Sequence, residues 1–306
     1  MRRYERIERF PTRPAYTLVE TLVVIAILAV AVGLTAGGIQ RVRAAAARTT
    51  CANNLRQLGL AAELYHGARS QYPTGFTSAA QPKSLPYLGW PARLLPYLEQ
   101  DALWRRIEAA FRTDPSPLVF YGHPAHADLL KTSVRAFACP ADGRAASTQV
   151  ANGVPVAFTS YLGNSGRNHI QKDGVLYADS KTRHADITDG LSNTLLIGER
   201  PPANDFRIGW WYRGWGLYED GNGETVLGVR ERNFAADYRS CPPGPYSFAD
   251  DKAANPCAVF HFWSLHDGGA HWALCDGSVR FVRYAAADTL TALATRAAGD
   301  AATVPE

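Results

Sequence analysis

The sequence lacks the motifs that mark common enzymes and nucleic-acid-binding proteins. No Walker A, H-E-x-x-H or G-x-G-x-x-G pattern occurs in its 306 residues, and "GNSG" is not the G-x-S-x-G motif of a nucleophile elbow. The formal net charge is only +4, and most of it lies in the first fifteen residues, which hold five arginines and two glutamates. We therefore predict no catalytic residues and no nucleic-acid partner.

Cysteine is scarce, and no C-x-x-C pair occurs among the five cysteines, which are Cys51, Cys139, Cys241, Cys257 and Cys275. An odd number leaves at least one thiol unpaired. In an oxidising compartment such cysteines persist as disulfides, whereas in a reducing compartment they remain free buried thiols. Both alternatives are open at this point.

Only one long apolar run is present. Thr21 to Ile39 are nineteen uncharged residues, which as a helix span roughly 28 Å, close to the hydrocarbon thickness of a bilayer. We predict one transmembrane segment at about residues 18–39, followed by a large aqueous head. Arginines flank the run on both sides, so the positive-inside rule favours a cytoplasmic N-terminus only weakly.

Proline is absent between Ala15 and Tyr72, and a helical pattern continues beyond the apolar run. Apolar residues recur at spacings of four, three, four and three, namely Cys51, Leu55, Leu58, Ala62 and Tyr65. We predict one helix over residues 16–66, half in lipid and half packed on the head. A cleaved secretory signal is the alternative, but nineteen apolar residues exceed its usual length, and a charge within the apolar stretch is unusual there.

That charge is Glu20, which stands at the start of the apolar run. A lone carboxylate costs roughly 2.5 to 3.5 kcal/mol at mid-bilayer on insertion scales, and less near the interface. Glu20 therefore either reaches the headgroups or finds a cation.

The stretch "AYTLVETLVVIAILAVAVGL" resembles the N-terminal segment of type IV prepilins and type II secretion pseudopilins. The resemblance implies that residues 1–15 are a cytoplasmic leader, which a prepilin peptidase removes between Ala15 and Tyr16 before methylating the new amine. Glu20 is then the fifth mature residue, and the amine of Tyr16, in the same or a neighbouring subunit, is its cation. The family usually has glycine where this chain has Ala15.

Residues 67–306 have the turn dipeptides and short apolar segments of an α+β protein with an antiparallel β-rich head. The hairpin signal is strongest at Asp276-Gly277, where a type I′ turn would pair Leu274 with Val279 and Trp272 with Phe281. These four side chains would then share one face, and Cys275 would lie on the other, more polar face.

His266 precedes Asp276-Gly277 by ten residues. This spacing resembles the H-X9-DG signature of a bacterial prepilin-type family with a head domain of unknown function. The match extends through "YPTG", "LLPYLEQ", "FACPAD", "SYLGNSG" and "ITDGLSNTLLIGER". It implies a pilin-like, membrane-anchored assembly protein with a signature hairpin at residues 266–283.

Two metal hypotheses arise in the head. His261, His266 and His271 recur every five residues, but on a strand such residues alternate between faces, so we predict no metal there and expect His266 to stabilise the turn through Asp276. The oxygen-rich segment Glu219 to Glu224 could bind calcium, as the head loop of major pseudopilins does, although a hairpin turn explains it equally well. No other cofactor is expected.

Cys51 lies on the apolar stripe of the predicted helix, and Cys139 ends a short apolar segment before a turn. We predict a disulfide between them, a second one between Cys241 and Cys257, and a free Cys275. "ITDGLSNT" is interpreted as turn structure.

These features predict a structural subunit of a type II secretion or type IV pilus-like assembly. It would be a single-pass protein of the inner membrane, with a periplasmic head and other pilin-like subunits as partners. The alternative is a membrane-tethered carbohydrate- or peptide-binding module that uses Trp210, Trp211 and Trp215.

Overall fold

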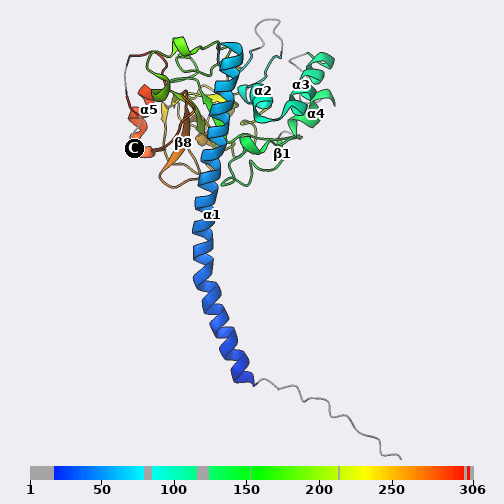
Figure 1. Ribbon diagram of the computed structural model, residues 1–306, viewed down its shortest axis with the longest axis vertical. Helices are drawn as coiled ribbons and strands as arrows, with labels where there is room; N and C mark the ends of the chain where they lie inside the picture. Colours follow the sequence, from blue (N-terminus) through cyan, green and yellow to red (C-terminus); the bar gives the residue numbers. More distant parts are fainter. Residues whose placement is uncertain are drawn as a thin grey trace, which may run out of the picture. The chain divides into compact units, whose positions relative to one another are not determined.

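The computed structural model describes residues 17–78, 85–115, 124–151, 153–212, 214–299 and 302–303. The chain divides into two compact units, Met1–Ala46 and Ala47–Glu306, which are described separately. Helix α1 (Leu18–Arg69) runs without a break through both units, three residues further than predicted at its C-terminal end (Figure 1).

The N-terminal unit holds the apolar part of α1. Its side chains are exposed over the described apolar stretch, from Leu18 at 80% to Val32 at 65%. This helix is long and apolar enough to cross a membrane, and it is the one such helix among the described residues.

Among its described residues, the head contains the C-terminal part of α1 and four further α-helices: α2 (Trp90–Leu94), α3 (Asp101–Thr113), α4 (Pro124–Leu130) and α5 (Ala287–Leu293). In Figure 1, α2, α3 and α4 lie together on one side of the head and α5 lies on the other. The part of the head that the structure describes has nine strands, β1 (Gln149–Ala151), β2 (Val154–Val156), β3 (Tyr161–Asn164), β4 (Leu195–Glu199), β5 (Val226–Leu227), β6 (Arg230–Glu231), β7 (Tyr246–Ser247), β8 (Gly269–Leu274) and β9 (Val279–Arg283).

Five strands form the central sheet in the order β5-β3-β4-β8-β9. All its pairs are antiparallel except β3 with β5, which is parallel. The pairs β1-β2 and β6-β7 form small separate sheets. The predicted α+β class, with a long N-terminal helix and a mainly antiparallel head, is confirmed, and the fold is consistent with that of pilin-like proteins.

Both faces of the central sheet are covered. The predicted stripe of α1 packs on one face, with Cys51, Leu55, Leu58 and Ala62 completely buried beside Ala273 of β8. On the opposite face Trp272 packs with Phe262, Val282, Leu290 and Leu293. Strands β3, β4 and β8 are therefore buried along their whole length, as expected for strands between two layers.

The predicted register of the hairpin is wrong by one residue. The structure pairs Ala273 with Val279, Trp272 with Arg280 and His271 with Phe281. Leu274 N–H donates to Ser278 O, so three residues, Cys275 to Gly277, form the loop instead of two. The shift turns Phe281 towards the α1 face, where the Arg48 guanidinium lies 3.6 Å from its ring centre, and it buries Cys275 completely.

Candidate functional site

The signature residues Asp276 and Gly277 form the tip of the β8-β9 hairpin. Gly277 has φ of +78°, while Asp276 is not among the positive-φ residues, so the loop is a three-residue turn ending in left-handed glycine. Asp276 Oδ1 accepts a 2.9 Å hydrogen bond from Ser278 N–H and thereby caps this turn. A type I′ turn, which needs positive φ at both central residues, is excluded.

The hairpin tip is docked on the rest of the head. Cys275 N–H donates to Thr194 O, and Asp276 N–H donates to Leu191 O. Tyr72 Oη–H donates to Cys275 O at 2.9 Å. The segment "ITDGLSNT" thus supports the signature turn in addition to forming its own turn, and its Asp189 accepts hydrogen bonds from Ala298 and Gly299 N–H in the C-terminal segment.

His266 lies in the turn before β8 and does not contact Asp276 in the way we predicted. Its Nε2 is 3.3 Å from Glu199 Oε1 and 3.5 Å from Cys139 Sγ. Glu199, at the end of β4, also accepts from His271, whose backbone N–H is 2.6 Å and whose Nδ1 is 3.2 Å from Oε2. The result is a buried cluster of one carboxylate and two imidazoles, which we call the Glu199 cluster.

His266 and His271 do not point to opposite faces of a strand, as we predicted. That prediction required a strand from His261 onwards, but β8 begins only at Gly269, and the preceding turn brings the two rings to 5.4 Å between centroids. His261 is separate from them and contacts Asp251 Oδ2 at 2.8 Å. The sequence signal that we missed is Glu199, a charged residue in the otherwise apolar segment "LLIGE".

Two opposing effects act on the pKa of Glu199. Complete burial alone would raise it, but the hydrogen bonds and charges of His266 and His271 outweigh burial and hold the pKa below its usual value. The carboxylate therefore stays ionised and joins β4, β8 and the turn before β8.

The Glu199 cluster adjoins the first disulfide. Cys51 on α1 is bonded to Cys139, and Cys241 is bonded to Cys257, so both predicted disulfides are confirmed. Cys275 is unpaired, as predicted, but it is buried and does not lie on a more polar face.

Cys51, Cys139, Glu199 and His266 form the one group of potential metal ligands found close together among the described residues. The two sulfur atoms of this group are bonded to each other, so they are not available as thiolates. The cluster is thus suited to joining α1, the sheet and the turn before β8.

In the segment Glu219 to Glu224, which we considered for calcium, side-chain oxygens accept hydrogen bonds from backbone N–H groups of the protein. Asp220 Oδ1 accepts from Asn222 N–H at 2.9 Å, and Glu224 Oε2 accepts from Gly209 N–H at 2.7 Å. Asn222 Nδ2 donates to Glu231. Calcium binding stays a prediction.

The tryptophans divide into two groups. Trp210 and Trp211 are completely buried in the core and are unavailable to a ligand. Trp215 is partly exposed and stacks on Tyr87, with 5.3 Å between ring centroids.

At the N-terminus, Ala15 and Tyr16 lie outside the described residues. Glu20 is described, and its Oε2 accepts from both the backbone N–H and the hydroxyl of Thr17 at 2.9 Å. Thr17 Oγ1 in turn accepts from Glu20 N–H at 3.3 Å. This is a capping box, whose T-x-x-E signal at residues 17–20 is visible in the sequence but was not recognised.

The structure defines the class of protein: an α+β protein with a long N-terminal helix and a β-rich head. The chain belongs to the family described as "Protein of unknown function (DUF1559)", whose model matches residues 40–289. The matched range includes His266, Asp276 and Gly277 and begins after the apolar run, so it leaves the leader and Glu20 untested. Neither the curated proteins nor the solved structures contain a match to this chain.

Proposed function

We propose that this protein is a membrane-anchored, pseudopilin-like structural subunit of a type II secretion or type IV pilus-like assembly. Family membership and the apolar N-terminal helix are compatible with this function. The proposal assigns no catalytic role to the head.

The observation that carries the proposal is the exposed apolar surface of the N-terminal part of α1. This surface is continuous, with Leu22, Ile25 and Ile27 all at least 60% exposed. Such a surface is unfavourable in water and marks a membrane or protein contact. From Cys51 onwards the same helix has one buried stripe and a disulfide to the rest of the head, so this part of α1 belongs to the core of the head.

The two disulfides support a location for the head outside the cytoplasm, because disulfides persist in oxidising compartments. We propose the inner membrane with a cytoplasmic N-terminus and a periplasmic head. The partners would be a prepilin peptidase and other pilin-like subunits.

Mass spectrometry of the mature N-terminus, on protein isolated from membranes, tests this function. We expect the chain to start at N-methylated Tyr16. An Ala15→Gly variant should be processed at least as completely, and Ala15→Arg should remain uncut. A mature chain beginning beyond Ile39 would show a cleaved signal sequence and contradict the proposal, as would an intact N-terminus in cells with an active peptidase.

A further inference from the structure

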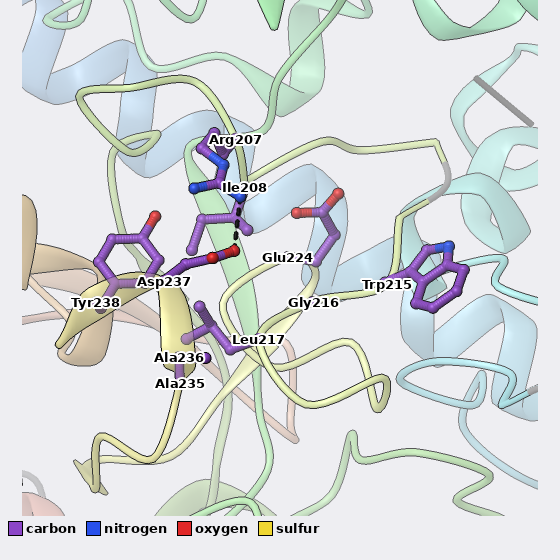
Figure 2. A pocket seen from close by; sticks show the side chains of 10 residues that line it. All are labelled: Arg207, Ile208, Trp215, Gly216, Leu217, Glu224, Ala235, Ala236, Asp237 and Tyr238. Atoms are coloured by element: carbon purple, nitrogen blue, oxygen red, sulfur yellow. Dashed lines mark hydrogen bonds and ion pairs between the residues drawn. The ribbon is translucent and has the colours of Figure 1, made fainter. Parts of the chain in front are cut away.

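The head contains a pocket that the proposed structural role does not use. Its volume is about 290 Å³, and it lies between the loop around Arg207, the loop around Trp215 and the short helix Ala236–Tyr238 (Figure 2). Apolar walls come from Ile208, Leu217 and Ala236, while the ring of Trp215 points away from the other lining side chains in Figure 2. Polar groups come from Glu224, Asp237 and Arg207.

The walls of this pocket are held in place before any ligand binds. The second disulfide fixes Cys241, whose N–H donates to Tyr238 O at 2.9 Å. Asn233 Nδ2 donates to both Tyr238 O and Cys241 O. A preformed wall lowers the conformational entropy that binding would otherwise cost.

The polar groups of the pocket differ in depth: one is buried, and two lie at the exposed rim. Glu224 is buried, and its carboxylate accepts from Gly209 N–H. Figure 2 shows the Glu224 carboxyl group directed towards the side on which Ile208 lies. At the rim, Arg207 Nη2 and Asp237 Oδ2 form an exposed ion pair of 2.6 Å, which joins two walls of the pocket.

The charges of these groups select against an ionic ligand. Arg207 and Asp237 neutralise each other at the rim. Burial raises the pKa of Glu224 to about 8, so its carboxyl group is mostly protonated at neutral pH and both donates and accepts hydrogen bonds. A ligand with a net charge would find no unpaired countercharge among the described residues of this lining.

We propose that the pocket binds a neutral carbohydrate, either a monosaccharide or the terminal ring of a glycan. The volume of about 290 Å³ lies just below the usual range of ligand pockets, roughly 300–1,000 Å³, and so suits a single sugar ring. Apolar walls suit the C–H faces of a sugar ring, and the planar carboxyl and guanidinium groups suit adjacent hydroxyls. This proposal does not depend on the pilin-like function.

The test is ligand-observed NMR with the full chain in detergent micelles and a panel of neutral monosaccharides, their methyl glycosides and short oligosaccharides. We expect saturable binding of at least one neutral sugar. Binding of methyl glycosides and oligosaccharides would identify a glycan end, and binding of reducing monosaccharides alone would identify a free sugar.

Three variants locate the site. Ala236→Phe, at an exposed position on the rim, should abolish binding, whereas Ala297→Phe, at an exposed position outside the pocket lining, should leave it unchanged. Glu224→Gln keeps an acceptor for Gly209 N–H, but it replaces a hydroxyl that donates and accepts with an amide NH2 that only donates. It should weaken binding up to about tenfold, the change expected for one lost hydrogen bond.

The proposal is overturned if no neutral sugar binds to the wild-type chain. It is also overturned if Ala236→Phe binds as well as wild type while retaining the wild-type melting temperature, or if a charged analogue binds more tightly than its neutral parent.

Discussion

At the scale of single residues, Glu199 connects β4 with β8 and with the turn before β8. Its carboxylate is completely buried and is held by His266, His271 and the backbone of β8. We predict that Glu199→Gln lowers the free energy of unfolding by about 1–3 kcal/mol, because an amide replaces a charge-assisted acceptor and turns a donor towards the histidines.

Asp128→Asn is the matched control for Glu199→Gln. It makes the same carboxyl-to-amide change in an exposed ion pair with Lys131, where the expected loss is much smaller because exposed pairs contribute little to stability. Urea unfolding of both variants measures the difference. Equal losses would show that the Glu199 cluster contributes no more than a surface pair.

His66 provides a prediction about pH. Its ring stacks on His184 at 3.5 Å between centroids, and its Nε2 accepts from His184 N–H. Burial and the neighbouring charge of His184 lower the pKa of His66, against an opposing effect of Glu63. The unfolded chain therefore takes up this proton first, so the stability should fall as pH decreases below about 6.5.

Unfolding measured between pH 7.5 and 5 tests this effect. His66→Gln should remove the part of the loss that begins near pH 6.5. It should leave the losses that begin below about pH 4.5, where Glu199 and Asp251, whose pKa values are lowered by their histidine partners against burial, become protonated. A wild-type pH profile in His66→Gln would contradict the assignment.

At the scale of elements, the signature turn depends on one backbone conformation. A Cβ atom at Gly277 would meet no atom within 4 Å, so Gly277→Ala has no steric cost apart from its φ of +78°. We predict a loss of about 1–2 kcal/mol, the cost of a left-handed conformation for a residue with a side chain.

Gly67→Ala is the control for the turn. Gly67 is helical, and a Cβ there also meets no atom within 4 Å. The same substitution should therefore stabilise the protein by up to about 1 kcal/mol, because alanine favours helix. Melting temperatures that move in the same direction for both variants would refute the turn argument.

The same elements show what the sequence could predict. Helix α1 and its face that bears Cys51 followed from local periodicity, because a helix places every third or fourth residue on one face. The choice of Cys139 as the partner rested instead on its place at the end of a short apolar segment before a turn. The turn at Asp276-Gly277 was also a local signal, but two-residue and three-residue loops share this dipeptide, and the difference of one residue moved Phe281 to the other face.

At the scale of the whole molecule, apart from the disulfides, the contacts between distant segments of the chain escaped prediction. Glu199 and His266 are far apart in the sequence and meet only because β8 pairs with β4. The pocket near Glu224 is assembled from loops without a repeating pattern. No spacing along the chain specifies such contacts, whereas the buried stripe of α1 follows from spacing alone.

Assembly is also a property of the whole molecule, and Glu20 tests it. Glu20 has a structural role in the capping box with Thr17, and under the proposed function it also pairs with the amine of Tyr16 in the same or a neighbouring subunit. Glutamine can replace glutamate in a capping box, so Glu20→Gln removes the charge but keeps the cap. We predict normal insertion and leader removal, but poor incorporation into fibres.

Thr17→Val is the matched variant, because it keeps the charge and removes the cap. It should cost about 1 kcal/mol of local helix stability and still assemble, since the bilayer also stabilises this helix. Incorporation is measured as the fraction of protein in sheared fibres, and insertion by membrane fractionation. If Glu20→Gln assembles like wild type while Thr17→Val does not, the role of Glu20 is to cap the helix, and the pairing between subunits is wrong.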